Sequence, residues 1–108
     1  MRYLVYHSKD PSDMVKMLND DNILKEVNLK NYNMVAMVEA LNTNDVFMVT
    51  NHIEKPWWEN SEIIKHYINT RSTSIGDIIV EFDFKTPAAK AFIVSGLGFK
   101  EVKLKGGK

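Results

Sequence analysis

The stretch with the strongest chemical character is NTRSTSIGDIIVEF, residues 69–82. Arg71 is followed there by three consecutive hydroxyl side chains, those of Ser72, Thr73 and Ser74. A Gly-Asp pair ending at Asp77 then leads into an apolar run that is typical of a strand. A guanidinium, hydroxyls and backbone N–H groups in one loop are donors from which proteins build anion-binding cradles. Anion binding is therefore one function that these residues could serve.

A purely structural function explains the same loop. Gly76-Asp77 is an ordinary turn signal ahead of a strand, and hydroxyl side chains satisfy neighbouring backbone groups in loops. Arg71 can pair with a nearby acid or lie over Trp57 or Trp58. On this interpretation we expect an ordered turn whose hydroxyls mostly bond backbone, with Arg71 at its rim and free to contact a partner. Removing such an arginine should cost the fold little.

Trp57 and Trp58 are the second conspicuous feature. Adjacent side chains in an extended loop point in different directions, so we expect one ring in the core and the other partly exposed. An exposed tryptophan among polar residues can anchor an interface. The polar neighbours here are Asn51, His52, Glu59 and Asn60. The alternative is that both rings cover the edge of the core.

No recognised catalytic or metal-binding pattern accompanies these residues. The three histidines, His7, His52 and His66, lack the i, i+4 spacing of a helical metal site. The absence of cysteine excludes disulfides, thiol catalysis and cysteine-based zinc sites. The GLGFK segment lacks the spacing of a phosphate loop and precedes a strand-like pattern. We therefore assign no catalytic residue, no metal and no cofactor, and favour a protein that is not an enzyme.

The composition is typical of one globular domain. The chain has 108 residues, of which 44% are hydrophobic and 26% charged, which suits a single core. Basic and acidic residues number 14 each, and zero net charge argues against a general nucleic-acid binder. The sequence has neither the pattern of a signal peptide nor a membrane-spanning run. We expect a soluble cytoplasmic protein with no membrane attachment.

Apolar periodicity and turn signals predict the strands. Five are expected, at about 2–8, 33–41, 77–84, 91–95 and 99–104. The first has apolar residues on both faces, which is typical of an interior strand. The last three should form a meander, with KTPAAK as the turn between the first two of them. Five of the strand residues are predicted to be buried: Val5, Val35, Met37, Ile79 and Ile93.

Cap signals and apolar stripes predict the helices. Three are expected, in DPSDMVKMLND from Asp10, at about 44–53, and in SEIIKHYIN. The segment DDNILKEVNLKNYN fits either a further short helix or a loop. The element order predicts a single α+β domain over residues 1–108, with a mainly antiparallel sheet of about five strands and two to four helices over one face.

Three segments, DVFMVTNHIEKPWWEN, RSTSIGDIIVEF and FIVSGLGFKEV, resemble a family of small uncharacterised proteins encoded in bacteriophages, plasmids and bacterial genomes. The family pattern has a helix ending in Leu-Thr-Asn, an aromatic-bearing loop, an Arg-Ser-Thr-Ser-Val-Gly-Asp-Val motif and a final Gly-Phe strand. YodL-like domains carry a related signature. Val49 and Ile75 stand here where the pattern has Leu and Val. The resemblance covers most of residues 32–104 and implies a mobile-element setting, in the host cytoplasm if phage-encoded, without an established activity.

The leading hypothesis is a small non-enzymatic binding protein of phage or mobile-element type that docks on a host or viral protein. The candidate partner-binding residues are Asn51, His52, Trp57, Trp58, Arg71, Ser72, Thr73, Ser74 and Asp77. The alternative is a nucleic-acid or nucleotide-binding module that uses the Arg71 loop and the lysines of the C-terminal KEVKLKGGK. A third hypothesis is a hydrolase or transferase built on His52, Asp77 and Arg71. The identity of the partner and the oligomeric state stay open, a homodimer included.

Overall fold

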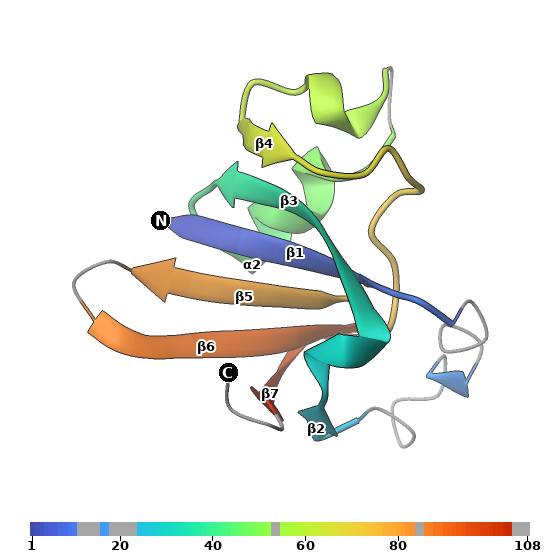
Figure 1. Ribbon diagram of the computed structural model, residues 1–108, viewed down its shortest axis with the longest axis vertical. Helices are drawn as coiled ribbons and strands as arrows, with labels where there is room; N and C mark the ends of the chain where they lie inside the picture. Colours follow the sequence, from blue (N-terminus) through green and yellow to red (C-terminus); the bar gives the residue numbers. More distant parts are fainter. Residues whose placement is uncertain (11–15, 18–23, 53–54, 84–85, 105–108) are drawn as a thin grey trace.

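One curved sheet runs through the molecule. The computed structural model describes residues 1–10, 16–17, 24–52, 55–83 and 86–104. The strands are β1 (Arg2–Ser8), β2 (Glu26–Val27), β3 (Tyr32–Glu39), β4 (Ile63–His66), β5 (Ile78–Asp83), β6 (Thr86–Ser95) and β7 (Gly98–Leu104). Their order across the seven-stranded sheet is β2-β7-β6-β5-β1-β3-β4, and only the short β2–β7 pair is parallel. β4 forms the upper edge in Figure 1, and β2 lies at the lower edge.

β1 lies inside the sheet, as the apolar residues on both its faces predict. It pairs with β3 on one side and with β5 on the other. Tyr3, Val5 and His7 are buried and alternate with the half-buried Leu4 and Tyr6. Because successive side chains of a strand point to opposite faces, β1 contributes to the packing on both sides of the sheet.

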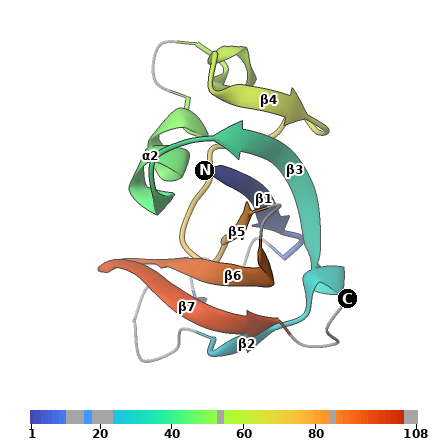
Figure 2. The same ribbon diagram turned by 90° about the vertical axis from the view of Figure 1, so that its left-hand side faces the viewer.

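The helix α2 (Thr43–Val49) and the 3-10 turn η3 (Trp57–Glu59) cover one face. Figure 2 shows α2 on one side of the sheet. Val46 and Trp57 pack there with Val5, Val38 and Ile79 in a buried cluster. Asn42 caps α2, because its side-chain oxygen accepts a hydrogen bond of 2.9 Å from the amide of Asp45.

The segment that joins β2 to β3 covers the opposite face. It includes the 3-10 turn η2 (Leu29–Asn31), and Figure 2 shows β3 curving from beside β4 towards η2 and β2. Val27 and Tyr32 pack there with Ile78, Val80 and Ile93. The sequence predicts cover on one face only, but the structure has cover on both.

Two predicted elements are wrong. SEIIKHYIN was predicted to be a helix, yet Ile63–His66 form β4, which pairs with β3. Short apolar runs of this kind fit either element, and pairing with a neighbouring strand decides between them. KTPAAK was predicted to be a turn, yet Thr86–Ser95 form β6, which continues through most of that segment.

The sheet is larger and the helical content smaller than predicted. Seven strands replace the predicted five, and α2, η2 and η3 accompany them within the described ranges. The segment DDNILKEVNLKNYN supplies β2, η2 and the start of β3. The helix predicted from Asp10 lies almost wholly outside the described residues, and the helix predicted at about 44–53 is α2, which ends at Val49.

Other predictions are confirmed. The sheet is mainly antiparallel, and β5, β6 and β7 form the expected meander. Of the five predicted core residues four are buried, whereas Met37 is only half-buried. The radius of gyration of 13.0 Å is that of one compact domain of this length. Within the described part of the chain, no helix is long and apolar enough to cross a membrane.

Candidate functional site

The loop from Arg71 to Asp77 folds around the carboxylate of Asp77, the residue immediately before β5. The Asp77 side chain has 0% exposure. The Arg71 guanidinium donates to it twice, from Nη1 to Oδ2 at 2.5 Å and from Nη2 to Oδ1 at 2.8 Å. The backbone amides of Ser74 and Ser8 donate to Oδ2 at 2.8 Å and to Oδ1 at 2.9 Å. Arginine and backbone amides therefore surround one internal carboxylate.

This arrangement fills the anion cradle suggested by the sequence with the protein's own carboxylate. The Arg71 side chain is 41% exposed, which agrees with the expected place at the rim of the loop. Its guanidinium fork is nevertheless bound to Asp77, and this hydrogen bonding raises the pKa of Arg71. The expectation that losing Arg71 would cost the fold little is therefore revised, since the buried Asp77 would lose its counter-charge.

A buried chain of hydrogen bonds beneath the loop links β1 to α2. His7 Nε2 lies 2.9 Å from Thr73 Oγ1. Thr73 Oγ1 donates to Thr50 Oγ1 at 2.8 Å, and Thr50 Oγ1 donates to the carbonyl of Val46 at 2.8 Å. Because both hydroxyl protons are used in these bonds, His7 donates its Nε2 proton to Thr73. The loop is thereby fixed to a strand and to the end of a helix.

His7 is held uncharged at the base of the loop. The residue is only 3% exposed, and burial lowers its pKa to about 4. Asp77 opposes this shift, with Oδ2 at 3.8 Å from His7 Nε2, whereas the charge of Arg71 adds to it. His7 Nδ1 is buried without a hydrogen-bond partner among the described residues. A proton on Nδ1 would thus create a buried charge whose N–H has no acceptor among the described residues.

The hydroxyls of the loop were expected to bond mostly to backbone groups, and this expectation is wrong for two of the three. Ser72 does bond to backbone, because its Oγ accepts from the amide of His52 at 2.8 Å. Thr73 instead bonds the His7 and Thr50 side chains, and Ser74 Oγ accepts from Arg71 Nη1 at 3.1 Å. The hydroxyls are structural, but they serve mainly to connect side chains.

Trp57 ties the loop to the core. Its side chain is fully buried, and its indole N–H donates to the carbonyls of Thr70 and Arg71 at 3.2 and 3.0 Å. Its backbone amide donates to Nδ1 of His52 at 3.1 Å. Trp57 therefore positions the loop and cannot itself contact a partner.

Trp58 lies at the surface and is half-exposed, which confirms the prediction that one ring is buried and the other partly exposed. Its ring meets those of Trp57 and His52 edge to face, with centroids 5.4 and 5.5 Å apart. It stacks on His66 of β4 at 6.0 Å and 25°. Rings on several sides thus fix the orientation of Trp58.

Beside Trp58, β4 and the residues after it expose large apolar side chains. Ile64, Tyr67 and Ile68 are 44%, 41% and 39% exposed. The ammonium of Lys65 lies 5.5 Å from the centre of the Tyr67 ring. We call the group of Trp58, Ile64, His66 and Ile68 the β4–Trp58 surface; Tyr67, which follows His66 directly, is not part of it.

The structure divides the nine predicted site residues into two groups. Trp57, Thr73 and Asp77 are buried and hold the loop. Asn51, His52, Trp58, Arg71, Ser72 and Ser74 all reach solvent, and the side-chain amide of Asn51 also donates to the carbonyl of Phe47.

Sequence reasoning missed three parts of this region. His7 and Thr50 were not linked to the loop, although His7 shares a strand face with Tyr3 and Val5, which signals burial. The β4 edge was missed because its segment was predicted to be helical. No sequence signal identified Thr50 as a partner of Thr73, which lies 23 positions away.

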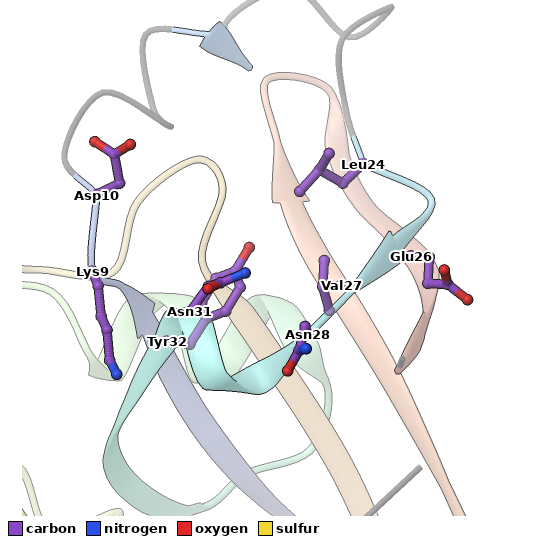
Figure 3. A pocket seen from close by; sticks show the side chains of 8 residues that line it. All are labelled: Lys9, Asp10, Leu24, Glu26, Val27, Asn28, Asn31 and Tyr32. Carbon is purple, nitrogen blue, oxygen red and sulfur yellow. The ribbon is translucent and has the colours of Figure 1, made fainter. Parts of the chain in front are cut away.

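A pocket of about 610 Å³ lies between the end of β1 and the β2–η2 segment (Figure 3). Its lining mixes charged, polar and apolar side chains: Lys9, Asp10, Leu24, Glu26, Val27, Asn28, Asn31 and Tyr32. Glu26 points away from Lys9 and Asp10, so these charges do not converge. Among the described residues, no group of three or more histidines and acids could hold a metal ion.

Comparisons of the chain with models of protein families, with curated proteins and with solved structures gave no match. The fold and the site define a single compact domain, mostly of strands in one mixed sheet, in which the pair of the partly exposed Arg71 and the buried Asp77 holds the loop that precedes β5. The resemblance to small phage, plasmid and bacterial proteins stays a prediction.

Proposed function

We propose that this protein is a small non-enzymatic binding protein of phage or mobile-element type. It docks on a host or viral protein through the β4–Trp58 surface and the adjoining Asn51 and His52. The observation that carries the proposal is the partly exposed Trp58 ring, held between His52 and His66 beside the exposed apolar side chains of β4. The mobile-element setting rests on the resemblance of three sequence segments alone, the loop motif among them.

The chemistry of this surface suits protein recognition. Tryptophan and tyrosine dominate the binding energy of interfaces, because their large rings bury much area with few rotatable bonds. Trp58 is already oriented by its ring contacts, so it would lose little side-chain entropy on binding. Ile64 and Ile68 extend the apolar area beside it. Contiguous apolar surface on a small domain is a common mark of an interaction site.

The Arg71 loop contributes to this function by holding the surface in place. Ser72 accepts the amide proton of His52, and the carbonyls of Thr70 and Arg71 accept the indole proton of Trp57. His52 and Trp57 are both ring neighbours of Trp58. The Arg71–Asp77 pair keeps the loop closed, so the same loop that resembles an anion cradle acts as the support of the docking surface.

One observation weighs against the nucleic-acid or nucleotide alternative. The Arg71 fork and the Ser74 amide are both bonded to Asp77, so an external phosphate would have to displace a buried carboxylate.

A capture experiment tests the docking proposal. Immobilised protein is incubated with bacterial host lysate, with and without nuclease, and bound proteins are identified. We expect a nuclease-resistant partner that is lost with Trp58→Ala but kept with Leu41→Ala, a matched truncation at an exposed apolar residue outside the surface. Retention by Trp58→Ala would contradict the proposal. Loss of capture after nuclease treatment would favour the nucleic-acid alternative.

A further inference from the structure

We infer that the loop around Asp77 is a carboxylate-binding site that is built independently of the side chain that fills it. In the wild-type protein the ligand is the carboxylate of Asp77 itself. When that side chain is cut back, the same donors should bind a free carboxylate ion from solution, such as acetate or formate. This chemistry goes beyond the proposed docking function and does not depend on it.

The donors around Asp77 match both oxygens of a carboxylate. Four N–H groups divide evenly between them, because Oδ1 accepts from Arg71 Nη2 and the Ser8 amide, and Oδ2 accepts from Arg71 Nη1 and the Ser74 amide. We call these donors the carboxylate cradle. A guanidinium fork binds a carboxylate through two parallel hydrogen bonds, and backbone amides of turns form anion-binding concavities. The cradle therefore supplies what a free carboxylate requires.

The Arg71 guanidinium is also held by groups other than Asp77. Its Nη1 donates to the carbonyl of Ser72 at 2.9 Å and to Ser74 Oγ at 3.1 Å. The carbonyl of Arg71 accepts from the indole of the buried Trp57 at 3.0 Å. These contacts orient the fork without help from the carboxylate, and donors that are already oriented lose little freedom when a ligand binds.

The Ser8 amide is positioned by the sheet. Ser8 is the last residue of β1 and lies opposite Tyr32 in the ladder with β3. The next amide, that of Lys9, donates to the carbonyl of Asn31 at 3.0 Å. Because the backbone is paired before and after Ser8, its amide should keep its direction when the Asp77 side chain is absent.

The Ser74 amide lies between two anchored parts of the loop. Before it, the amide of Thr73 donates to the carbonyl of Thr50 at 3.0 Å, and the Thr73 hydroxyl donates to Thr50 Oγ1 at 2.8 Å. After it, the amide of Gly76 donates to the carbonyl of Val94 at 2.9 Å. None of these bonds involves the Asp77 side chain, so its removal should leave the loop in place.

The site suits a small carboxylate better than a phosphate. The Asp77 side chain has 0% exposure, so the protein encloses the bound group. A tetrahedral phosphate would bring further charged oxygens for which the cradle has no donors, and burying them would be unfavourable. Arg71 is 41% exposed, so a small ion can reach the cradle from the rim of the loop.

Two variants with ligands of matched size test the proposal. Asp77→Gly removes Cβ and leaves room for acetate, whereas Asp77→Ala keeps Cβ and leaves room for formate. Each variant should gain melting temperature with its matched ion, because the ion binds the folded state. The gain should saturate in the millimolar range, since such small ions make few contacts. Sodium chloride at the same ionic strength is the control, and the wild type should not distinguish the ions.

The order of the effects tests the location of the bound ion. Acetate should stabilise Asp77→Gly more than Asp77→Ala, where its methyl group would meet Cβ. In Asp77→Asn the amide fills the cradle, so neither ion should act. Adding Arg71→Ala to Asp77→Gly removes the fork and should raise the half-saturating acetate concentration by about tenfold or more.

A variant that is unfolded in chloride still gives an answer, because its matched ion should then restore the near-ultraviolet circular dichroism of the folded protein. Equal effects of chloride and the matched ion in both variants would overturn the proposal. Phosphate that acts as well as acetate on Asp77→Gly would overturn the assignment to carboxylates. Capture of a partner by the wild-type chain is measured separately, so the docking proposal and this one can fail independently.

Discussion

The guanidinium of Arg71 and the carboxylate of Asp77 form a double hydrogen-bonded ion pair in which the acid is fully buried and the base reaches solvent. Two backbone amides, those of Ser8 and Ser74, complete the surroundings of the acid. The pair connects the loop to β1 and β5, so its first role is to stabilise the fold.

Arg71→Ala should therefore lower the free energy of unfolding by roughly 3 kcal/mol, because it leaves a buried carboxylate without its counter-charge. Urea denaturation measures this loss. Arg2→Ala is a suitable control, since Arg2 lies 3.6 Å from the exposed Glu39 and such surface pairs contribute less than about 1 kcal/mol. Equal losses in the two variants would contradict the structural role of Arg71.

The stability of the fold should fall in acid through His7. The unfolded chain binds a proton at His7 near the ordinary pKa of 6.5, whereas the native chain binds it only near 4. The native state therefore loses stability as the pH falls from 6.5 to about 4, by roughly 3 kcal/mol at about 1.4 kcal/mol per pH unit.

Urea denaturation across this pH range checks the prediction for His7. In His7→Gln an amide can still donate to Thr73 but cannot titrate, so the pH dependence should be smaller than in the wild type. Identical pH dependence in the two proteins would show that other groups cause the loss.

Thr73→Val should destabilise the protein by about 1–3 kcal/mol, because it leaves the Nε2 proton of His7 without its acceptor in a buried site. Ser74→Ala removes a hydroxyl of the same loop that reaches solvent, so it should cost less. Thermal unfolding of both variants separates them. A larger effect at Ser74 would mean that the buried chain to Thr50 contributes little.

The two tryptophans should respond oppositely to quenchers. In Trp58→Phe the emission comes from the buried Trp57 and should resist quenching by acrylamide. In Trp57→Phe the emission comes from the half-exposed Trp58 and should be quenched readily. Trp57→Phe should also lower the melting temperature, because the carbonyls of Thr70 and Arg71 lose a donor. Equal quenching in the two variants would contradict this division.

The sequence by itself determined the features that depend on local patterns. The alternation in residues 2–8 predicted an interior strand, and β1 is one. The Gly-Asp turn after the hydroxyl run predicted the start of β5, and the adjacent tryptophans predicted one buried and one partly exposed ring. Periodicity and turn chemistry act over a few residues, so a single sequence is enough to show them.

Tertiary structure decided how these elements meet. The amide of Ser8 reaches Asp77 across 69 positions, and His7 reaches Thr73 across 66, because β1 and β5 are neighbours in the sheet. The apolar residues around Ile63 fit either a helix or a strand. The segment forms a strand because it pairs with the edge of β3. The donors of the loop bind the buried carboxylate of Asp77 and not an external anion. Side-chain pairing over such separations depends on which strands become neighbours, and no local pattern in the chain encodes that choice.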